Sequence, residues 1–512
     1  MTGKKLLLIN WSKKGMRMNN LYILLSCSMA SGIIAGLSRF SDYAGLLIFF
    51  AYIPLIKIFN LKLNKKDILI TSAVYSTASV ITGLHWIGLV TLPGLFGIII
   101  LFTVYNFISF FVIRKIWSSE KGFYLRLFAF LSVMLSSELL QNFTELRFPW
   151  MNAGYSLSGF LPLIQVADLG GVYLISALIY TVNFLLSSLS KRKFIALILI
   201  FAAWLGYGFI RLNTLKIKKD DFKISMIQPS IGQGIKWEEK LRNYIVDLHS
   251  KHSLKLAKKT DLIIWTESAL PYYLAKNFEM KKYMAKLSEL IEAPVFLGYQ
   301  DYEKRPDREG YMIFNAASMI KPSGKLHKPY FKQKLVPFGE RMPFLDIFPF
   351  LWNIHLGQAN FEYGYENVVF EVKDKKFAPL ICFEVVFDDL TRDMFQKGID
   401  FIVNISNDAW FYKSVGAYQH SRMAVFRATE TRRPVLRCAN TGFTFMVDPK
   451  GKINNSTKLY EVTERTYNLP LCEEKPFYMT KFYYYTRLWI ISAIFLFLKS
   501  MTDSYGLNRR RK

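Results

Sequence analysis

A chain of 512 residues is too long for one compact core, and 52% of its residues are hydrophobic, more than is usual in soluble domains. The net charge of +27 would suit a nucleic-acid-binding protein, but much of it lies in short segments between apolar runs. That pattern indicates membrane orientation, so we expect no nucleic acid as a partner. The cysteines stand far apart without zinc-ligand spacing, so we expect no metal, no cofactor and no disulfide framework, although one bridge through Cys472 stays open. The four are Cys27, Cys382, Cys438 and Cys472.

Eight apolar runs are long enough, or nearly so, to cross the roughly 30 Å of a bilayer core. The first follows a basic segment but has no convincing small-residue cleavage site, so we interpret it as an uncleaved span. The eighth is short and closes the chain. The predicted spans are 20–38, 43–59, 68–84, 92–113, 124–141, 171–189, 194–211 and 488–498.

The basic residues predict how these spans are oriented. With a cytoplasmic amino terminus, the segments that face inward hold about 21 Lys and Arg, whereas the opposite short loops hold about two. We therefore expect residues 1–212 to form a membrane domain of seven spans. Residues 213–486 would lie outside the cytoplasm, and residues 487–512 would form the eighth span with a basic cytoplasmic tail.

The outer region alternates strand-like and helix-like stretches, which predicts an α/β layered domain. The run Leu262 to Trp265 is typical of a buried strand, and helical patterns follow at 239–258 and 278–292. Turn signals at 322–324 and 448–451 predict hairpins. Further strands are predicted at 295–299, 311–320, 368–372, 378–383, 401–405 and 435–447.

Three of the strand-like runs end near side chains that can do chemistry: Glu267, Lys332 and Cys382. A cysteine nucleophile needs a base to take its proton, and the oxyanion that it forms needs a fixed positive charge or N–H donors. A glutamate and a lysine can supply both functions. Each residue alone has an ordinary interpretation, because strand cysteines usually fill cores and surface Lys and Glu are usually solvated.

A series of motifs in this region resembles the nitrilase, or carbon-nitrogen hydrolase, superfamily, and within it the apolipoprotein N-acyltransferases. The resemblance covers nearly the whole chain, including the eight-span layout with the outer domain between the last two spans. One motif alone would be weak, but the ordered set is specific. The motifs are Gln228-Pro229 through Lys236-Trp237, Trp265-Thr266-Glu267, Leu335 to Glu340, Cys382-Phe383-Glu384, Asn404 to Phe411, Gln419-His420, Arg427 to Glu430, and Asn440-Thr441-Gly442.

The resemblance implies that Glu267 is the general base, Lys332 the oxyanion stabiliser and Cys382 the nucleophile. It selects Lys332 over Lys334, because the family motif places the catalytic lysine three positions before Leu335. We expect Lys334 to be solvated. Supporting roles are implied for Trp237, Phe383, Glu340 and Glu384.

Glu340 and Phe383 would support the site in different ways. Glu340 would hold the ammonium of Lys332 in place and keep it charged. Phe383 stands where the family commonly has tyrosine, so any role of a phenolic hydroxyl is absent and only its backbone N–H can serve the oxyanion.

Other polar residues of the motifs are predicted to be scaffold. Asn407 and Asp408 suit a turn after a strand, and Arg427 and Glu430 suit an ion pair three residues apart on a helix. Cys438 belongs to no recognised motif and is predicted to be a core residue.

The family resemblance also implies a reaction. An acyl group would pass from a membrane phospholipid, through a thioester on Cys382, to the α-amino group of the diacylglyceryl-cysteine of a lipoprotein, with ping-pong kinetics. It implies a multi-pass protein of the bacterial inner membrane with a nitrilase-like αββα sandwich in the periplasm. The expected partners are the phospholipid donor, the diacylglyceryl-modified apolipoprotein and the bilayer.

Two other functions stay open on the sequence. A membrane-anchored amidase or nitrilase would use the same triad but pass the acyl group to water. A carrier or sensor with an inactive outer domain would also have many spans, but the triad positions are intact. We identify only one acidic residue near mid-span, Asp168, and Gly170 and Gly171 beside it predict a loop rather than an ion path.

Overall fold

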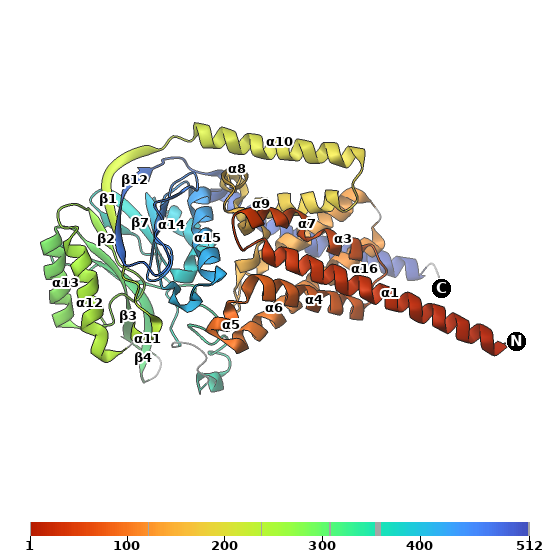
Figure 1. The fold of residues 1–512 in the computed structure, drawn as a ribbon, viewed down its shortest axis with the longest axis horizontal. Coiled ribbons are helices and arrows are strands. Elements are labelled where there is room, and N and C mark those ends of the chain that lie inside the picture. Colours follow the sequence, from red (N-terminus) through yellow and green to blue (C-terminus); the bar gives the residue numbers. More distant parts are fainter. Residues whose placement is uncertain (1, 121, 237, 307–308, 354–359, 510–512) are drawn as a thin grey trace.

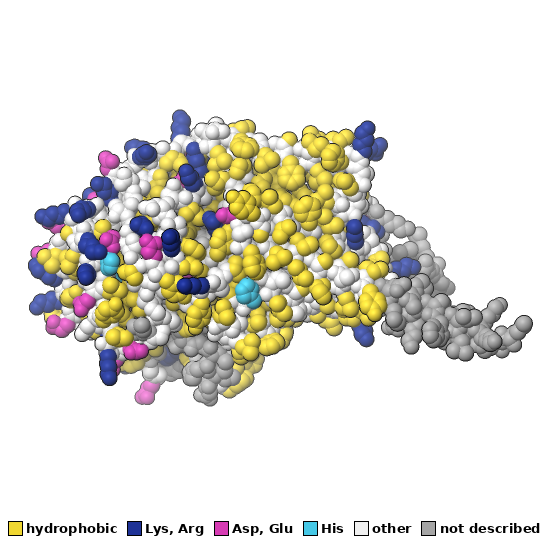
Figure 2. All heavy atoms as spheres, viewed as in Figure 1, with side chains coloured by type: hydrophobic (Ala, Val, Ile, Leu, Met, Phe, Trp, Pro, Cys, Tyr) yellow, Lys and Arg dark blue, Asp and Glu magenta, His cyan; other side chains and the backbone are white. Residues whose placement is uncertain are grey.

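The computed structural model describes residues 2–509 except 121, 237, 307–308 and 354–359. A bundle of long helices forms one half of the molecule and a layered α/β sandwich forms the other (Figure 1). Apolar side chains cover most of the helical half, whereas charged side chains gather over the sandwich and near the far ends of the helices (Figure 2). Such a division is typical of a membrane protein with an extramembrane domain.

Among the described residues, six helices contain a stretch that is long and apolar enough to cross a membrane. They form a bundle in which most helices run roughly side by side (Figure 1). The helices are α1 (Thr2–Leu37), α4 (Lys65–Leu84), α6 (Leu92–Ser119), α7 (Phe123–Leu140), α9 (Ala167–Leu186) and α10 (Lys191–Thr214).

The two remaining predicted spans look different in the structure. The run predicted at 43–59 is broken into η1 (Tyr43–Leu47), α2 (Ile48–Ala51) and α3 (Ile53–Phe59), because Pro54 in the first turn of α3 cannot continue a preceding helix. The final run begins α16 (Leu488–Arg509), a 22-residue helix that packs against α7 and α6. Six of the eight predicted spans are therefore confirmed by length and composition.

Two glycines let α1 and α4 approach closely. A methyl group added at Gly36 would lie 1.8 Å from Thr82 Oγ1 and 2.8 Å from the backbone nitrogen of Gly83. One added at Gly32 would lie 2.6 Å from the carbonyl oxygen of Tyr75. The spacing of four residues is the small-residue pattern that lets membrane helices pack backbone to backbone.

Helix α9 is kinked where the sequence predicts a loop. Gly170 and Gly171 leave helical geometry, and Gly171 has a φ of +64°, a conformation that favours glycine. Asp168 beside them is buried and pairs with Arg432 at 2.7 Å and Arg211 at 3.0 Å. A paired carboxylate of this kind anchors helices, which agrees with the prediction that Asp168 is no ion path.

Glu138, near the end of α7, is a second buried acidic residue that the sequence analysis overlooked. One of its carboxylate oxygens accepts hydrogen bonds from Tyr180 Oη at 2.6 Å and from the backbone N–H of Ala153 at 2.8 Å. It joins α7 to α9 and to the loop between them.

The outer domain consists of two six-stranded sheets. The first has the order β12-β1-β2-β3-β4-β5 and the second β11-β10-β9-β8-β7-β6. Phe296 of the first sheet and Phe377 of the second lie 5.1 Å apart, as expected for side chains that fill the space between the sheets. The strands are β1 (Lys218–Gln228), β2 (Leu262–Ile264), β3 (Val295–Lys304), β4 (Tyr311–Ile320), β5 (Tyr330–Phe331), β6 (Phe370–Val372), β7 (Lys375–Ile381), β8 (Phe401–Ser406), β9 (Val435–Ala439), β10 (Phe445–Val447), β11 (Ile453–Asn454) and β12 (Thr463–Leu471).

Helices complete the four layers, as the sequence predicts. The first sheet is covered by α12 (Arg242–Leu254) and α13 (Phe278–Ile291), which lie far from the membrane helices (Figure 1). The second is covered by α14 (Asp388–Phe395) and α15 (Val415–Thr431), and α15 faces the membrane helices. The fold is thus the predicted αββα sandwich joined to a helical membrane domain.

Several predicted strands have different bounds in the structure, and two of these differences have a clear cause. The strand predicted at 378–383 ends at Ile381, because Cys382 adopts a φ of +52° and turns the chain out of the sheet. The strand predicted at 435–447 is a hairpin of β9 and β10 with a turn at 440–444. The Gly in this turn, Gly442, packs against the carboxylate of Asp408.

The two halves are joined by buried polar contacts as well as by packing. The carboxylate of Glu430 on α15 accepts a hydrogen bond from the backbone N–H of Val172 on α9 at 3.0 Å. Arg427 pairs with Glu430 at 2.7 Å, with both side chains fully buried. The hydroxyl of Tyr155, in the membrane half, donates to the carbonyl of Val386 at 3.0 Å. The predicted Arg427–Glu430 ion pair therefore exists and lies where the two halves meet.

Candidate active site

The fold brings the three predicted catalytic residues to one edge of the sandwich. Glu267 follows β2 by three residues, Lys332 directly follows β5, and Cys382 directly follows β7. The strands β2 and β7 each pair in parallel with neighbours in their own sheet. The carboxyl ends of parallel strands are where α/β domains commonly gather their reactive groups.

Lys332 lies between two carboxylates. Its Nζ is 2.8 Å from Glu340 Oε1 and 3.5 Å from Glu267 Oε1, and its side chain is fully buried. Burial alone would lower the pKa of Lys332, but the negative charges of Glu340 and Glu267 outweigh it and raise the pKa above its ordinary value. The lysine is therefore held as a fixed positive charge.

Asn315, on β4, completes this cluster and was missed by the sequence analysis. Its Nδ2 donates to Glu267 Oε1 at 2.8 Å and to Glu340 Oε1 at 3.1 Å. The signal in the sequence is weak, because Asn315 is one of two polar residues within the largely apolar run Phe314 to Ile320. The amide therefore shares with Lys332 the same oxygen of each carboxylate and helps to fix both carboxylates in place.

Cys382 opens the short helix η6 (Cys382–Val386) in a left-handed backbone conformation, with a φ of +52°. Non-glycine residues with this geometry are uncommon and often lie at functional sites. Burial is the main cause that raises the pKa of the Cys382 thiol, the charge of Glu267 adds to it, and Lys332 opposes it. The thiol is protonated at rest, so it needs a base before it can attack.

Glu384 connects the turn at Cys382 to the strand that precedes Lys332. Burial raises its pKa to about 7, although N–H donors and the charge of Lys332 oppose that rise. Its oxygens accept from Tyr330 Oη at 2.8 Å and from the backbone N–H groups of Gln333 at 2.6 Å, Lys334 at 3.2 Å and Ile381 at 2.7 Å. Glu384 therefore ties together the segments that carry Cys382 and Lys332, whereas Glu340 contacts the ammonium of Lys332.

Phe383 contacts the membrane half. Its buried ring stacks with Phe148 and Trp150, at centroid distances of 6.1 and 6.2 Å, and meets Phe387 edge-on at 5.0 Å. The residue after Cys382 thus packs against the loop between α7 and α9.

We expect Phe383→Tyr to keep activity within a few fold of the parent, because this position can act on the oxyanion through its backbone N–H and the ring contacts would remain. The comparison of initial rates with Phe383→Leu, which loses the stacking, tests this. A hundredfold gain for Phe383→Tyr, worth about 2.7 kcal/mol in the barrier, would show that the missing hydroxyl impairs the chain.

The other described residues singled out in the sequence make structural contacts or lie in the core. The prediction that Lys334 is solvated is wrong, because its ammonium pairs with Asp389 at 2.7 Å and the side chain is mostly buried. Cys438 is buried in the core, as predicted. Asp408 pairs with Arg437 at 2.8 Å and with His420 at 2.9 Å. Trp237 lies outside the described residues.

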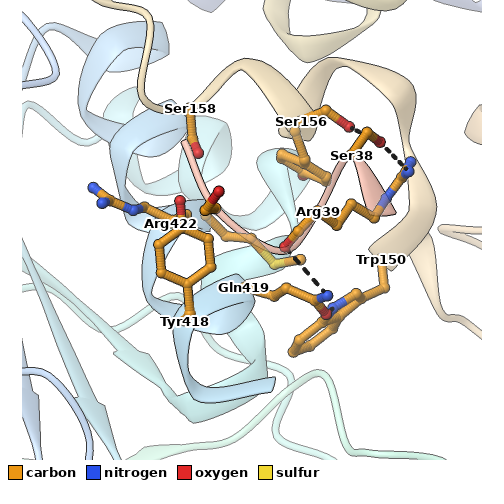
Figure 3. Close-up of a pocket in the computed structure, with 11 residues that line it drawn as sticks. Ser38, Arg39, Trp150, Ser156, Ser158, Tyr418, Gln419 and Arg422 are labelled. Atoms are coloured by element: carbon orange, nitrogen blue, oxygen red, sulfur yellow. Dashed lines mark hydrogen bonds between the residues drawn. The ribbon is translucent and has the colours of Figure 1, made fainter. Parts of the chain in front are cut away.

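Gln419, on α15, connects two loops of the membrane half to the sandwich through hydrogen bonds. Its Oε1 accepts from the indole N–H groups of Trp86 at 3.1 Å and Trp150 at 2.9 Å, and its Nε2 donates to the carbonyl of Gly83 at 2.8 Å. A small cavity of about 20 Å³ beside it, room for roughly one water, is also lined by Arg39 (Figure 3). The indole of Trp150, which stacks on Phe383, is thereby fixed by a hydrogen bond to Gln419 of the sandwich.

Family models match both halves of this architecture. Residues 223–470 match the family model described as carbon-nitrogen hydrolase, and residues 31–185 match that of the apolipoprotein N-acyltransferase N-terminal domain. A solved CN-hydrolase superfamily protein from Xanthomonas campestris covers 49% of this chain and 91% of its own, with 18% identity and a TM-score of 0.38.

Curated relatives match over longer stretches. Apolipoprotein N-acyltransferase from Geobacter metallireducens is 30% identical over 476 residues, which is 88% of this chain and 90% of that protein. The enzyme of the same name from Rickettsia prowazekii is 31% identical over 72% of this chain and 74% of its own length.

Fold and site together define a multi-pass membrane protein that carries a carbon-nitrogen hydrolase domain with a buried lysine-carboxylate cluster beside a cysteine. Within that class, the chain belongs to the apolipoprotein N-acyltransferase family. It is an acyltransferase.

Proposed function

We propose that the chain transfers a fatty acyl group from a membrane phospholipid to the α-amino group of the diacylglyceryl-cysteine of lipoproteins. Cys382 is the nucleophile, Glu267 the base and Lys332 the oxyanion stabiliser. The observation that carries the proposal is the buried ammonium of Lys332, which is held between Glu340 and Glu267. Family membership supports the choice of substrates.

In the first half-reaction, Glu267 takes the proton of the Cys382 thiol and the thiolate attacks the ester carbonyl of the phospholipid. The positive charge of Lys332 and backbone N–H groups stabilise the oxyanion. The carbon-oxygen ester bond then breaks, and Glu267 returns the proton to the alkoxide that leaves as a lysophospholipid. The acyl group remains on Cys382 as a thioester.

In the second half-reaction, the neutral α-amino group of the lipoprotein attacks the thioester. Glu267 takes a proton from the attacking nitrogen, the carbon-sulfur bond breaks, and the proton passes to the sulfur of Cys382. An amide forms and the free thiol is restored. Two substrates that react in turn with one cysteine give ping-pong kinetics.

The helical half supports lipid substrates. Helix α10 exposes large apolar side chains, among them Leu199 at 64% and Ile210 at 61%, as a lipid-facing helix does. The nucleophile turn contacts the membrane half through Phe383 and Trp150. Donor and acceptor can therefore keep their acyl chains in the bilayer while their reactive groups reach Cys382.

We place residues 1–212 and the span of 487–512 in the bacterial inner membrane, with residues 213–486 in the periplasm, since the basic segments all fall on the opposite side. Reporter fusions at about residue 300 and at the carboxyl terminus should report opposite compartments. If both fusions reported the same compartment, the eight-span topology would be ruled out.

The proposed function is tested by incubating the purified protein in detergent with labelled phospholipid and a diacylglyceryl lipopeptide. We expect label on the amino group of the lipopeptide, and none without phospholipid. An amidase would instead release free fatty acid or ammonia from a soluble amide without phospholipid. An inactive carrier would give no labelled product at all.

A further inference from the structure

A cavity of about 590 Å³ lies on the outer side of the sandwich, apart from the catalytic cluster. The starts of α12 and α13 border it, and Figure 1 shows both helices on the side remote from the membrane helices. The rest of the wall comes from the loop after Glu267 and from the end of β3. Its lining includes Arg242, Tyr272, Tyr273, Lys276, Gln300 and Tyr302. We name this cavity the outer groove.

The wall of the outer groove includes the segment that follows the catalytic base. Leu270, in its wall, follows Glu267 by three residues, and its backbone N–H bonds the carbonyl of Gly298 at 3.2 Å. Gln300, also in the wall, pairs directly with Asn315 across the ladder of β3 and β4. Because directly opposite residues of antiparallel strands point to the same face, Gln300 lies on the face from which Asn315 reaches Glu267.

The wall is built from tyrosines and cations. Tyr273 and Tyr302 meet edge-on at a centroid distance of 5.0 Å, and 40% of Tyr273 is exposed. The Lys276 ammonium lies 5.7 Å from the ring centre of Tyr302, and the Arg242 guanidinium 5.8 Å from that of Tyr272. Tyrosine rings of this kind contact peptide planes at low entropic cost, as in protein-binding sites rich in tyrosine.

We propose that the outer groove binds the polypeptide of the acceptor lipoprotein, namely the extended residues that follow its lipidated cysteine. The inference rests on the proposed function and adds the part of the acceptor that the chain recognises. Two cations in the wall, against the single acidic residue Glu279, favour a segment that carries acidic side chains.

The position of the outer groove favours the acceptor over the donor. A phospholipid reaches Cys382 from the bilayer, where Phe383 stacks on the membrane-half residue Trp150. The acceptor has a lipid end in the same bilayer, but its protein part must leave the site in the opposite direction. The outer groove lies on that opposite side and touches the segment of the base.

The test uses the full-length protein and two acceptors with the same diacylglyceryl-cysteine, one continued by a single residue and one by six residues. We expect Tyr273→Ala/Tyr302→Ala to raise KM for the long acceptor about tenfold and leave KM for the short one unchanged. The rate at which phospholipid acylates the enzyme should also stay unchanged. Tyr244→Ala is the matched control, because Tyr244 is exposed on α12 and does not line the outer groove.

Lys276→Glu gives an independent test that does not remove packing. The parent should prefer a long acceptor with aspartates after the cysteine to one with lysines, and this variant should reverse the preference. Equal effects on both acceptor lengths, or no reversal, would overturn the inference. Slower acylation by phospholipid would assign the outer groove to the donor instead. Failure of the parent itself to form an acyl-enzyme would refute the proposed function and not the outer groove.

Discussion

Replacement of Cys382 with alanine is expected to abolish transfer to the lipopeptide, whereas replacement of Cys438 with alanine should preserve it. Both thiols have a pKa that burial raises, so neither is ionised at rest. They differ in their neighbours. Cys382 lies in the field of Glu267 and Lys332, whereas Cys438 donates weakly to the carbonyls of Ile227 and Ile264 inside the core.

The two variants should be compared for transfer in detergent and for thermal unfolding. Cys438→Ala creates a small core cavity and should unfold at a slightly lower temperature while it retains turnover. Cys382→Ala should unfold like the parent and show no turnover. Turnover in Cys382→Ala would redirect the search for the nucleophile to Cys438 or Cys472.

Lys332→Met is expected to lower the rate of acyl-enzyme formation by about 10²- to 10³-fold, the usual loss when one oxyanion-stabilising group is removed, or roughly 2.7 to 4 kcal/mol. Methionine keeps much of the side-chain volume but not the charge. It also leaves the carboxylates of Glu267 and Glu340, both bonded to Asn315, without their shared cation. Some loss of folding stability should accompany the loss of rate, since unpaired buried charges are costly.

The double variant Lys332→Met/Glu340→Gln separates the two effects. In Lys332→Met, the carboxylates of Glu267 and Glu340 repel each other without a cation between them. Replacement of Glu340 with glutamine removes this repulsion, so the double variant should unfold at a higher temperature than Lys332→Met. Its rate should remain as low. If the double variant recovered its rate together with its stability, Lys332 would act on the fold alone. If Lys332→Met kept a rate within tenfold of the parent, Lys332 would have no part in the mechanism.

Features that depend on local pattern could be predicted from the sequence. The long apolar runs, the alternation of strands and helices, and the motifs around Glu267, Lys332 and Cys382 each occupy a short stretch of chain. The Gly170–Gly171 break was also visible, because two adjacent glycines interrupt an apolar run. The local pattern is enough for an α/β layered domain, and the family resemblance that the motifs carry adds the αββα sandwich and the choice of candidate catalytic residues.

Features that depend on pairing between distant segments could not be predicted. Asn315 matters only because β4 lies beside β3 and brings its amide to two carboxylates. Gln419 bonds indoles more than 260 residues earlier in the chain. The left-handed turn at Cys382 likewise depends on the packed surroundings rather than on residue type.

The most direct test of the proposed mechanism locates the acyl group after the purified protein meets labelled phospholipid without an acceptor. Digestion and mass spectrometry should find the acyl mass on the peptide that contains Cys382, and neutral hydroxylamine should release it, as expected for a thioester. Addition of the lipopeptide should then discharge the label to its amino group. An acyl group on any other residue, or a labelled enzyme that the lipopeptide cannot discharge, would contradict the mechanism.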